Sequence, residues 1–305
     1  MSHRIYRLIF TAAAAYNIAF GLWAALFPHA FFTLFRLTPP RYPAIWACLG
    51  MVVGLYGVGY AYAARHLDRA FPFIAIGLAG KVLGPIGWFL AVGNAELPFR
   101  TFPLIVFDDL IWWVPFGLFL LEGTAVARFF KRTAPYWCAA LHVIAACGTL
   151  LFLRAYDVAH PERWRAGWLL WMVAALTLAG FYAWWGARVA NVIPFAIAAV
   201  GLACDFAGES LFIGWIPAPG TSLFRTASLL TGGAGNGLYT LAAILLTLAT
   251  PLPPLLRRWA WLAWASGIAL TLFTILDISR GVVIASAALM TLFIPFVMML
   301  GVKLR

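Results

Sequence analysis

Charged side chains are scarce in this chain: 10% of its 305 residues are Asp, Glu, Lys or Arg, whereas 64% are hydrophobic and the mean hydropathy is +0.93. A soluble domain contains roughly 25% charged and 45–50% apolar residues, so this composition excludes a soluble domain. The apolar runs are about 20 residues long, which suits helices that cross a bilayer rather than barrel strands of about 10 alternating residues. The sequence therefore predicts an all-α, polytopic transmembrane helix bundle.

Motifs for metal, nucleotide or redox chemistry are also missing. The four cysteines fall within apolar runs and show neither a CxxC motif nor a Cys/His spacing suited to a metal. The glycine-rich run GGAGNG at 232–237 follows no strand and lies in an apolar segment, which argues against a phosphate-binding loop. No catalytic triad is visible. We expect no metal and no cofactor, and the sequence leaves open whether the chain is an enzyme.

The formal net charge of +11 does not indicate a nucleic-acid partner, because the basic residues form short clusters between apolar runs. About twelve Lys and Arg fall on the side of the N-terminus and about eight on the other side, so the positive-inside rule places both termini in the cytoplasm. We expect a multi-pass protein of the bacterial inner membrane, with the lipid bilayer as its partner. The first apolar stretch is long enough for an uncleaved helix, which we favour over a cleaved signal peptide.

About ten spans are predicted, and the most basic connection, ARFFKRTAP, divides them into four and six. The resulting domains are a four-helix module at 1–127, a basic cytoplasmic linker at 128–134 and a six-helix module at 135–305. We find no internal repeat of the kind that many transporters carry. The approximate spans are 5–27, 43–64, 71–92, 102–122, 135–153, 166–187, 191–213, 226–249, 258–277 and 281–301.

Acidic residues inside the apolar runs are the best functional lead, because a charge at the bilayer centre costs roughly 3 kcal/mol on insertion scales. Asp205 and Glu209 are four residues apart and share a helix face. At a rise of about 1.5 Å per residue, Asn236 in the next span reaches the depth of Asp205, and Asp277 lies at the outer end. We therefore predict an outward-facing intramembrane acidic cavity. Its carboxyls could carry a proton, bind a cation or act as a general acid, or they could only fix helix packing.

A second group of ionisable residues lies in the third and fourth predicted spans. Lys81 is expected to form a buried ion pair with Asp108 or Asp109, and only one of these should face it, because neighbouring residues on a helix diverge by about 100°. An isolated buried ion pair of this kind often has only a structural role in helix packing. Pro85 predicts a kink one turn beyond the lysine. Trp88 and Trp112 could line a cavity for a flat or isoprenoid-like ligand.

The first 125 or so residues resemble the small four-helix DoxX-like bacterial membrane proteins. The resemblance rests on a short basic start, a second span that ends GYAYAARHLDR, the Gly-Lys pair in LAGKVLG and the aspartate in FDDLIW, and it matches Lys81 and Asp109. It implies an accessory role. The PIGW segment and the doubled aspartate depart from the pattern, and nothing is recognised for residues 135–305.

Two interpretations from different classes follow. The first is a carrier or binding protein for a small amphiphile or an ion, with Asp205, Glu209 and Asn236 at its site. The alternative is a membrane-embedded enzyme that acts on a lipid or an isoprenoid, with Asp205 or Glu209 as general acid and tryptophans that stabilise positive charge. The sequence does not identify the ligand or the oligomeric state.

Overall fold

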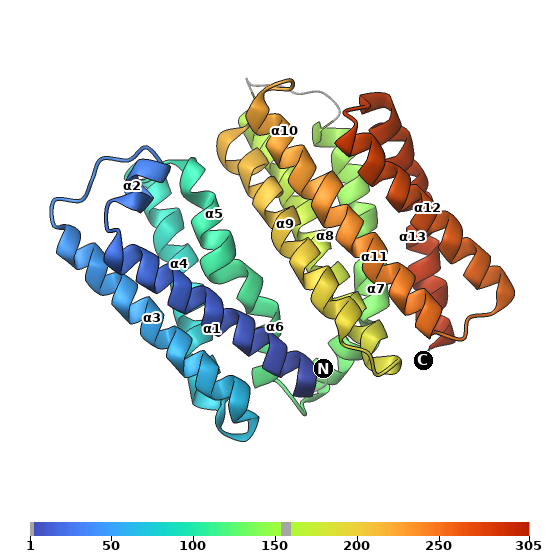
Figure 1. The fold of residues 1–305 in the computed structure, drawn as a ribbon, viewed down its shortest axis with the longest axis horizontal. Helices are drawn as coiled ribbons and strands as arrows, with labels where there is room; N and C mark the ends of the chain where they lie inside the picture. Colours follow the sequence, from blue (N-terminus) through green and yellow to red (C-terminus); the bar gives the residue numbers. More distant parts are fainter. Residues whose placement is uncertain (1–2, 154–159, 305) are drawn as a thin grey trace. The chain divides into compact units, whose positions relative to one another are not determined.

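A computed structural model describes residues 3–153 and 160–304, and every regular element in these ranges is helical (Figure 1). Nine helical stretches there are long and apolar enough to cross a membrane. The all-α, multi-pass fold predicted from composition is confirmed. These nine stretches are His3–Leu26, Pro43–Arg65, Phe71–Gly93, Phe99–Leu120, Ala125–Phe152, Pro161–Arg188, Ile193–Trp215, Ser222–Ala249 and Ser279–Lys303.

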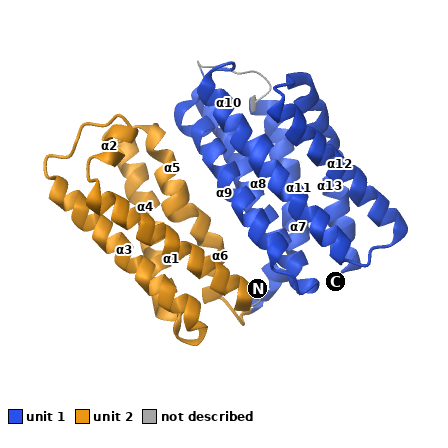
Figure 2. Ribbon diagram, viewed as in Figure 1, with its two compact units in different colours: residues 1, 125–305 blue, residues 2–124 orange. Residues whose placement is uncertain are grey.

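The chain divides into two compact units, Ser2–Thr124 and Ala125–Arg305, which we call the N-terminal and C-terminal units (Figure 2). We describe each unit by itself. Lys81, Asp108 and Asp109 belong to the N-terminal unit, and Asp205, Glu209, Asn236 and Asp277 belong to the C-terminal unit.

The N-terminal unit is a four-helix bundle in which neighbours along the chain are neighbours in space. Contacts run from α1 to α3, from α3 to α4, from α4 to α6, and from α6 back to α1. Its fourth span changes its winding, because a π-helical segment separates two α-helices. The elements are α1 (His3–Leu26), α2 (Ala30–Leu34), α3 (Pro43–Arg65), a 3₁₀ turn (Leu67–Arg69), α4 (Phe71–Gly93), a second 3₁₀ turn (Phe99–Thr101), α5 (Phe102–Ile105), the π-helix Val106–Leu110 and α6 (Ile111–Leu120).

The C-terminal unit is a ring of six long helical stretches. Contacts link α7 to α8, α8 to α9, α9 to α11, α11 to α12, α12 to α13, and α13 back to α7. Proline begins or nearly begins several of its helices, where the missing N–H would have no intrahelical acceptor. The elements are α7 (Ala125–Gly148), a π-helix (Thr149–Leu153), α8 (Pro161–Arg188), α9 (Ile193–Trp215), α10 (Ser222–Ser228), the π-helix Leu229–Gly235, α11 (Asn236–Ala249), α12 (Pro254–Ile275) and α13 (Ser279–Lys303).

Two details differ from the sequence-based expectation. Residues 128–134 are not a linker, because they lie within α7, which begins at Ala125. Arg, Lys and Ala are good helix formers, and Pro135 removes only one hydrogen-bond donor from the helix. The span predicted at 258–277 corresponds to α12, which lies outside the nine apolar stretches and carries Arg257 and Arg258 in its first turns.

Close packing of α1 on α3 depends on the absence of a side chain at Gly21. A Cβ atom at this position would lie 2.6 Å from the Gly50 carbonyl oxygen and 2.6 Å from the Gly54 amide nitrogen. Both atoms belong to the backbone and cannot rotate away. The hydrophobic effect does not drive helices together inside a bilayer, because lipid tails are as apolar as the side chains. Small residues let the backbones approach closely, and the resulting van der Waals packing stabilises the helix pair.

We predict that Gly21→Ala lowers the unfolding free energy of the purified protein by about 1–3 kcal/mol, the usual cost of overpacking. Gly87→Ala is the matched control, because a Cβ there meets no atom within 4 Å. Denaturant unfolding in detergent measures both variants. Equal stability of the two would contradict the close α1–α3 contact.

Candidate functional site

The acidic residues of α9 form one of two ionisable clusters. Asp205 is half-buried, and its Oδ2 accepts a hydrogen bond of 3.2 Å from the hydroxyl of Tyr239 on α11. Glu209, one turn further along α9, is only 2% exposed, and its Oε2 has no hydrogen-bond partner within the described residues. The neighbouring Ser210 hydroxyl is also buried without a partner there. The structure thus places a half-buried aspartate one turn from a buried glutamate.

Two tyrosines complete this cluster. Tyr182 on α8 donates a 2.7 Å hydrogen bond to the carbonyl oxygen of Tyr239, and the two rings stack with centroids 6.3 Å apart. Both residues are buried. We call Tyr182, Asp205, Glu209 and Tyr239 the acidic cluster; it joins α8, α9 and α11. Neither tyrosine was predicted from the sequence, although a phenol in the middle of an apolar run is a polar group that needs a partner.

Asn236 does not join the acidic cluster. Its side-chain amide donates to the Gly267 carbonyl oxygen at 2.7 Å and to Thr271 Oγ1 at 2.9 Å, both on α12. The physical reason is the π-helix Leu229–Gly235, which ends immediately before this residue. One extra residue in a helical turn rotates the side chains beyond it by about 100° relative to a regular helix. The depth of Asn236 was estimated from a regular helix, which does not capture that rotation.

Asp277 also lies apart from the acidic cluster. It is exposed, adopts a positive φ of 59° just after α12, and lies 3.4 Å from Nη1 of Arg225 on α10. The same guanidinium donates to the carbonyl oxygens of Thr274 and Ile275 at the end of α12. Arg225 therefore binds carbonyl oxygens at the C-terminus of a helix, where positive charge is favourable, and Asp277 lies beside this arginine.

The second cluster is in the N-terminal unit and surrounds Lys81, which is 5% exposed. Its ammonium donates to the main-chain carbonyl of Asp108 and lies 5.9 Å from the Tyr60 ring centroid and 6.0 Å from that of Trp112. The described residues contain no ion pair between Lys81 and Asp108 or Asp109. The predicted carboxylate partner is thus replaced by a backbone oxygen. We call these five residues the lysine cluster.

The π-helix Val106–Leu110 explains why a backbone oxygen is available. Within it, the Ile111 amide bonds to the Val106 carbonyl five residues back, so the regular α-helical pattern is interrupted. Side chains use the carbonyls released in this way. Trp112 Nε1 donates to the Phe107 carbonyl at 2.9 Å, and Lys81 donates to that of Asp108. π-Helical turns of this kind frequently occur at functional sites.

The two carboxyl groups of the lysine cluster have different surroundings. Asp109 is 5% exposed and packs against α4 at Gly84, where a Cβ would lie 2.6 Å from Asp109 Oδ2. Asp108 has a buried Oδ1 without a hydrogen-bond partner in the described chain. A glycine at position 84 is therefore needed for the carboxyl of Asp109 to reach α4.

Pro85 has a local consequence for Lys81. Proline has no amide hydrogen, so the carbonyl four residues earlier, that of Lys81, loses its intrahelical donor. Trp113 replaces that donor: its Nε1 donates a 2.8 Å hydrogen bond to the Lys81 carbonyl. The fourth span thus supplies two partners for Lys81. The Asp108 carbonyl accepts from its ammonium group, and the Trp113 indole donates to its main-chain carbonyl.

Trp88 is a packing residue in this structure. Its Nε1 donates to Thr101 Oγ1 at 2.8 Å, and its ring contacts Phe99 and Phe102 with centroids 5.2 and 5.7 Å away. Trp88 is therefore surrounded by other side chains and does not line a cavity among the described residues. Trp112, by contrast, lies beside the lysine ammonium.

The chain matches no protein-family model, no curated protein and no solved structure in these comparisons. The resemblance of the first 125 residues to DoxX-like proteins stays a prediction. Within the described residues, no group of three or more His, Cys, Asp or Glu side chains could hold a metal ion.

We predict that Trp113→Phe lowers stability by about 0.6–2 kcal/mol, the range for hydrogen bonds between membrane helices. In a Pro85→Ala background the cost should be much smaller, because the alanine amide can bond to the Lys81 carbonyl. Unfolding free energies of the two single variants and the double variant give the coupling. Strictly additive effects would show that the indole does not replace the donor missing at Pro85.

Proposed function

We propose that the chain is a carrier that exchanges protons for a small cationic amphiphile at the acidic cluster. One observation supports this above the others: Glu209 Oε2 is buried without a hydrogen-bond donor among the described residues. An ionised carboxylate in such surroundings is costly unless it gains a proton or a cation. The site therefore has a physical reason to take up positive charge.

No basic side chain competes for this role in the described part of the cluster. Asp205 accepts its hydrogen bond from the Tyr239 phenol, and Arg225 is engaged with Asp277 and the carbonyl end of α12. A permanent salt bridge would neutralise the carboxylates, and they could then not exchange a proton for a cation. A neutral phenol instead orients Asp205 and keeps its charge available.

The aromatic rings of the cluster favour an organic cation over a bare ion. Tyr239 touches Asp205 directly, and the stacked Tyr182 extends the aromatic surface. Faces of aromatic rings attract cations, and the apolar helix surface suits the hydrophobic part of an amphiphile. The enzyme interpretation has no comparable support, because Trp88, one of its expected cavity residues, is packed against phenylalanines.

The test uses tetraphenylphosphonium as a probe cation and purified full-length protein in detergent. We expect saturable binding that weakens about ten- to a hundredfold in Asp205→Asn and in Glu209→Gln, because each change removes a charged partner worth about 1.5–3 kcal/mol. Binding should also weaken as the pH falls, since protons compete with the cation for the same carboxyls.

Asp277→Asn is the matched control, because it removes an exposed acid that follows α12 and lies outside the cluster. It should bind the probe like the unmodified protein. Equal binding by all four proteins would refute the carrier proposal, and so would binding that does not respond to pH.

A further inference from the structure

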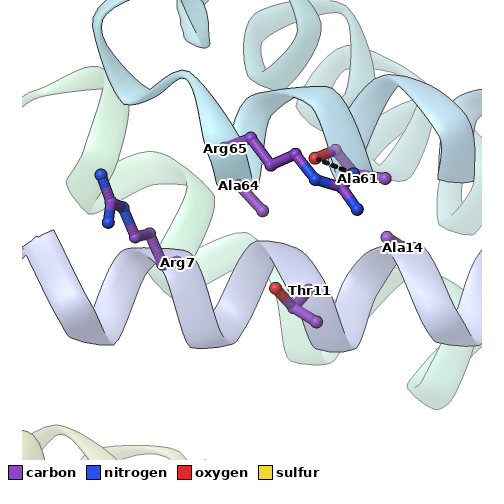
Figure 3. Close-up of a pocket in the computed structure, with 6 residues that line it drawn as sticks. All are labelled: Arg7, Thr11, Ala14, Ala61, Ala64 and Arg65. Atoms are coloured by element: carbon purple, nitrogen blue, oxygen red, sulfur yellow. Dashed lines mark hydrogen bonds between the residues drawn. The ribbon is translucent and has the colours of Figure 1, made fainter.

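A groove of about 430 Å³ opens between α1 and α3 in the N-terminal unit, far along the chain from the acidic cluster. Figure 3 shows its two walls: α1 contributes a row of residues at intervals of one helical turn, and α3 contributes its last turn. The volume is within the usual range for sites that bind small molecules. The lining residues are Arg7, Thr11, Ala14, Ala61, Ala64 and Arg65.

The groove is lined by two arginines, a threonine and alanines. Arg7, near the start of α1, and Arg65, the last residue of α3, leave their helices at the same end, and Ala14 and Ala61 lie towards the other end (Figure 3). The Arg65 side chain runs back along α3, so its guanidinium lies beside Ala61. Ala14 is seven residues further into the helix than Arg7, which corresponds to about 10 Å. The arginines thus mark the border of the apolar spans, and the alanines lie within them.

Both arginines have donors to spare. Arg65 makes one long hydrogen bond of 3.4 Å, to the Ala61 carbonyl of its own helix, and Arg7 makes no side-chain hydrogen bond within the described chain. Both side chains are exposed, and neither forms an ion pair there. By contrast, Arg69 at the same end of the bundle lies 3.6 Å from Asp68. A guanidinium offers a planar fork of donors that matches a phosphate group.

We infer that this groove binds an anionic phospholipid, with the phosphate on Arg7 and Arg65 and the glycerol and upper acyl chain along Thr11 and the alanines. In the complex the exposed Arg65 side chain exchanges its long bond to the Ala61 carbonyl for the phosphate. The combination of two arginines whose backbones lie at the membrane border and alanines inside the span distinguishes a lipid from a free anion. Basic pockets between transmembrane helices are known to hold lipid head groups. The site is independent of the proposed carrier function.

Native mass spectrometry of the full-length protein, titrated with phosphatidylglycerol or with phosphatidylcholine of the same acyl chains, tests this inference. We expect phosphatidylglycerol to bind more tightly than phosphatidylcholine. The double variant Arg7→Gln/Arg65→Gln should lose about ten- to thirtyfold in affinity for phosphatidylglycerol. Arg69→Gln removes a charge at the same end but outside the groove, and it should bind like the unmodified protein.

Thr11→Phe provides a second variant that leaves all charges in place. The position is exposed and lines the groove, so the larger ring should obstruct the lipid without disturbing the core, and phosphatidylglycerol binding should fall. The inference is overturned if Arg69→Gln weakens binding as much as the double variant, if Thr11→Phe binds normally, or if an excess of inorganic phosphate displaces the lipid completely. The last result would indicate a site for a free anion.

Discussion

The structure depends on one constraint: inside hydrocarbon, each polar group must find its partner within the protein. The tryptophans show how the chain meets it. In five places an indole N–H donates to a threonine hydroxyl, which in turn donates to a main-chain carbonyl. The pairs are Trp88–Thr101, Trp137–Thr133, Trp171–Thr149, Trp185–Thr250 and Trp264–Thr247. Four of them connect residues 13 or more positions apart, so the same bonds that satisfy the indoles also hold helices together.

The same constraint explains the places where the helices depart from α geometry. Pro85 and the π-helix Val106–Leu110 both leave carbonyls without a regular donor, and Trp113, Trp112 and Lys81 supply one in each case. In the C-terminal unit, the π-helix Leu229–Gly235 packs on α9, the helix of Asp205 and Glu209. Each ionisable cluster therefore lies next to a π-helical segment. In and beside these clusters, Glu209 Oε2, Asp108 Oδ1 and the Ser210 hydroxyl are buried without a hydrogen-bond partner in the described residues, and Glu209 is the basis of the functional proposal.

Composition and run length were sufficient to predict an all-α, multi-pass bundle, because hydrocarbon permits few backbone structures. The hydrogen-bond partners of the site residues could not be predicted in the same way. The partner of Asp205 is Tyr239 rather than Asn236, because the π-helix before Asn236 rotates it towards α12. Lys81 contacts the Asp108 carbonyl, which lies in another π-helix that interrupts the fourth span. A count of 3.6 residues per turn cannot locate such segments, so it does not give the helix face of the residues that follow them.

The account of the site therefore rests on the state of a single carboxyl group. Infrared spectroscopy of the purified protein at neutral pH observes the C=O stretch that only a protonated carboxyl produces. If Glu209 holds a proton that can be exchanged for a cation, the spectrum should contain such a band, which disappears in Glu209→Gln and diminishes when tetraphenylphosphonium is added. A band that is identical in the unmodified protein and in Glu209→Gln, or one that does not respond to the cation, would contradict the account.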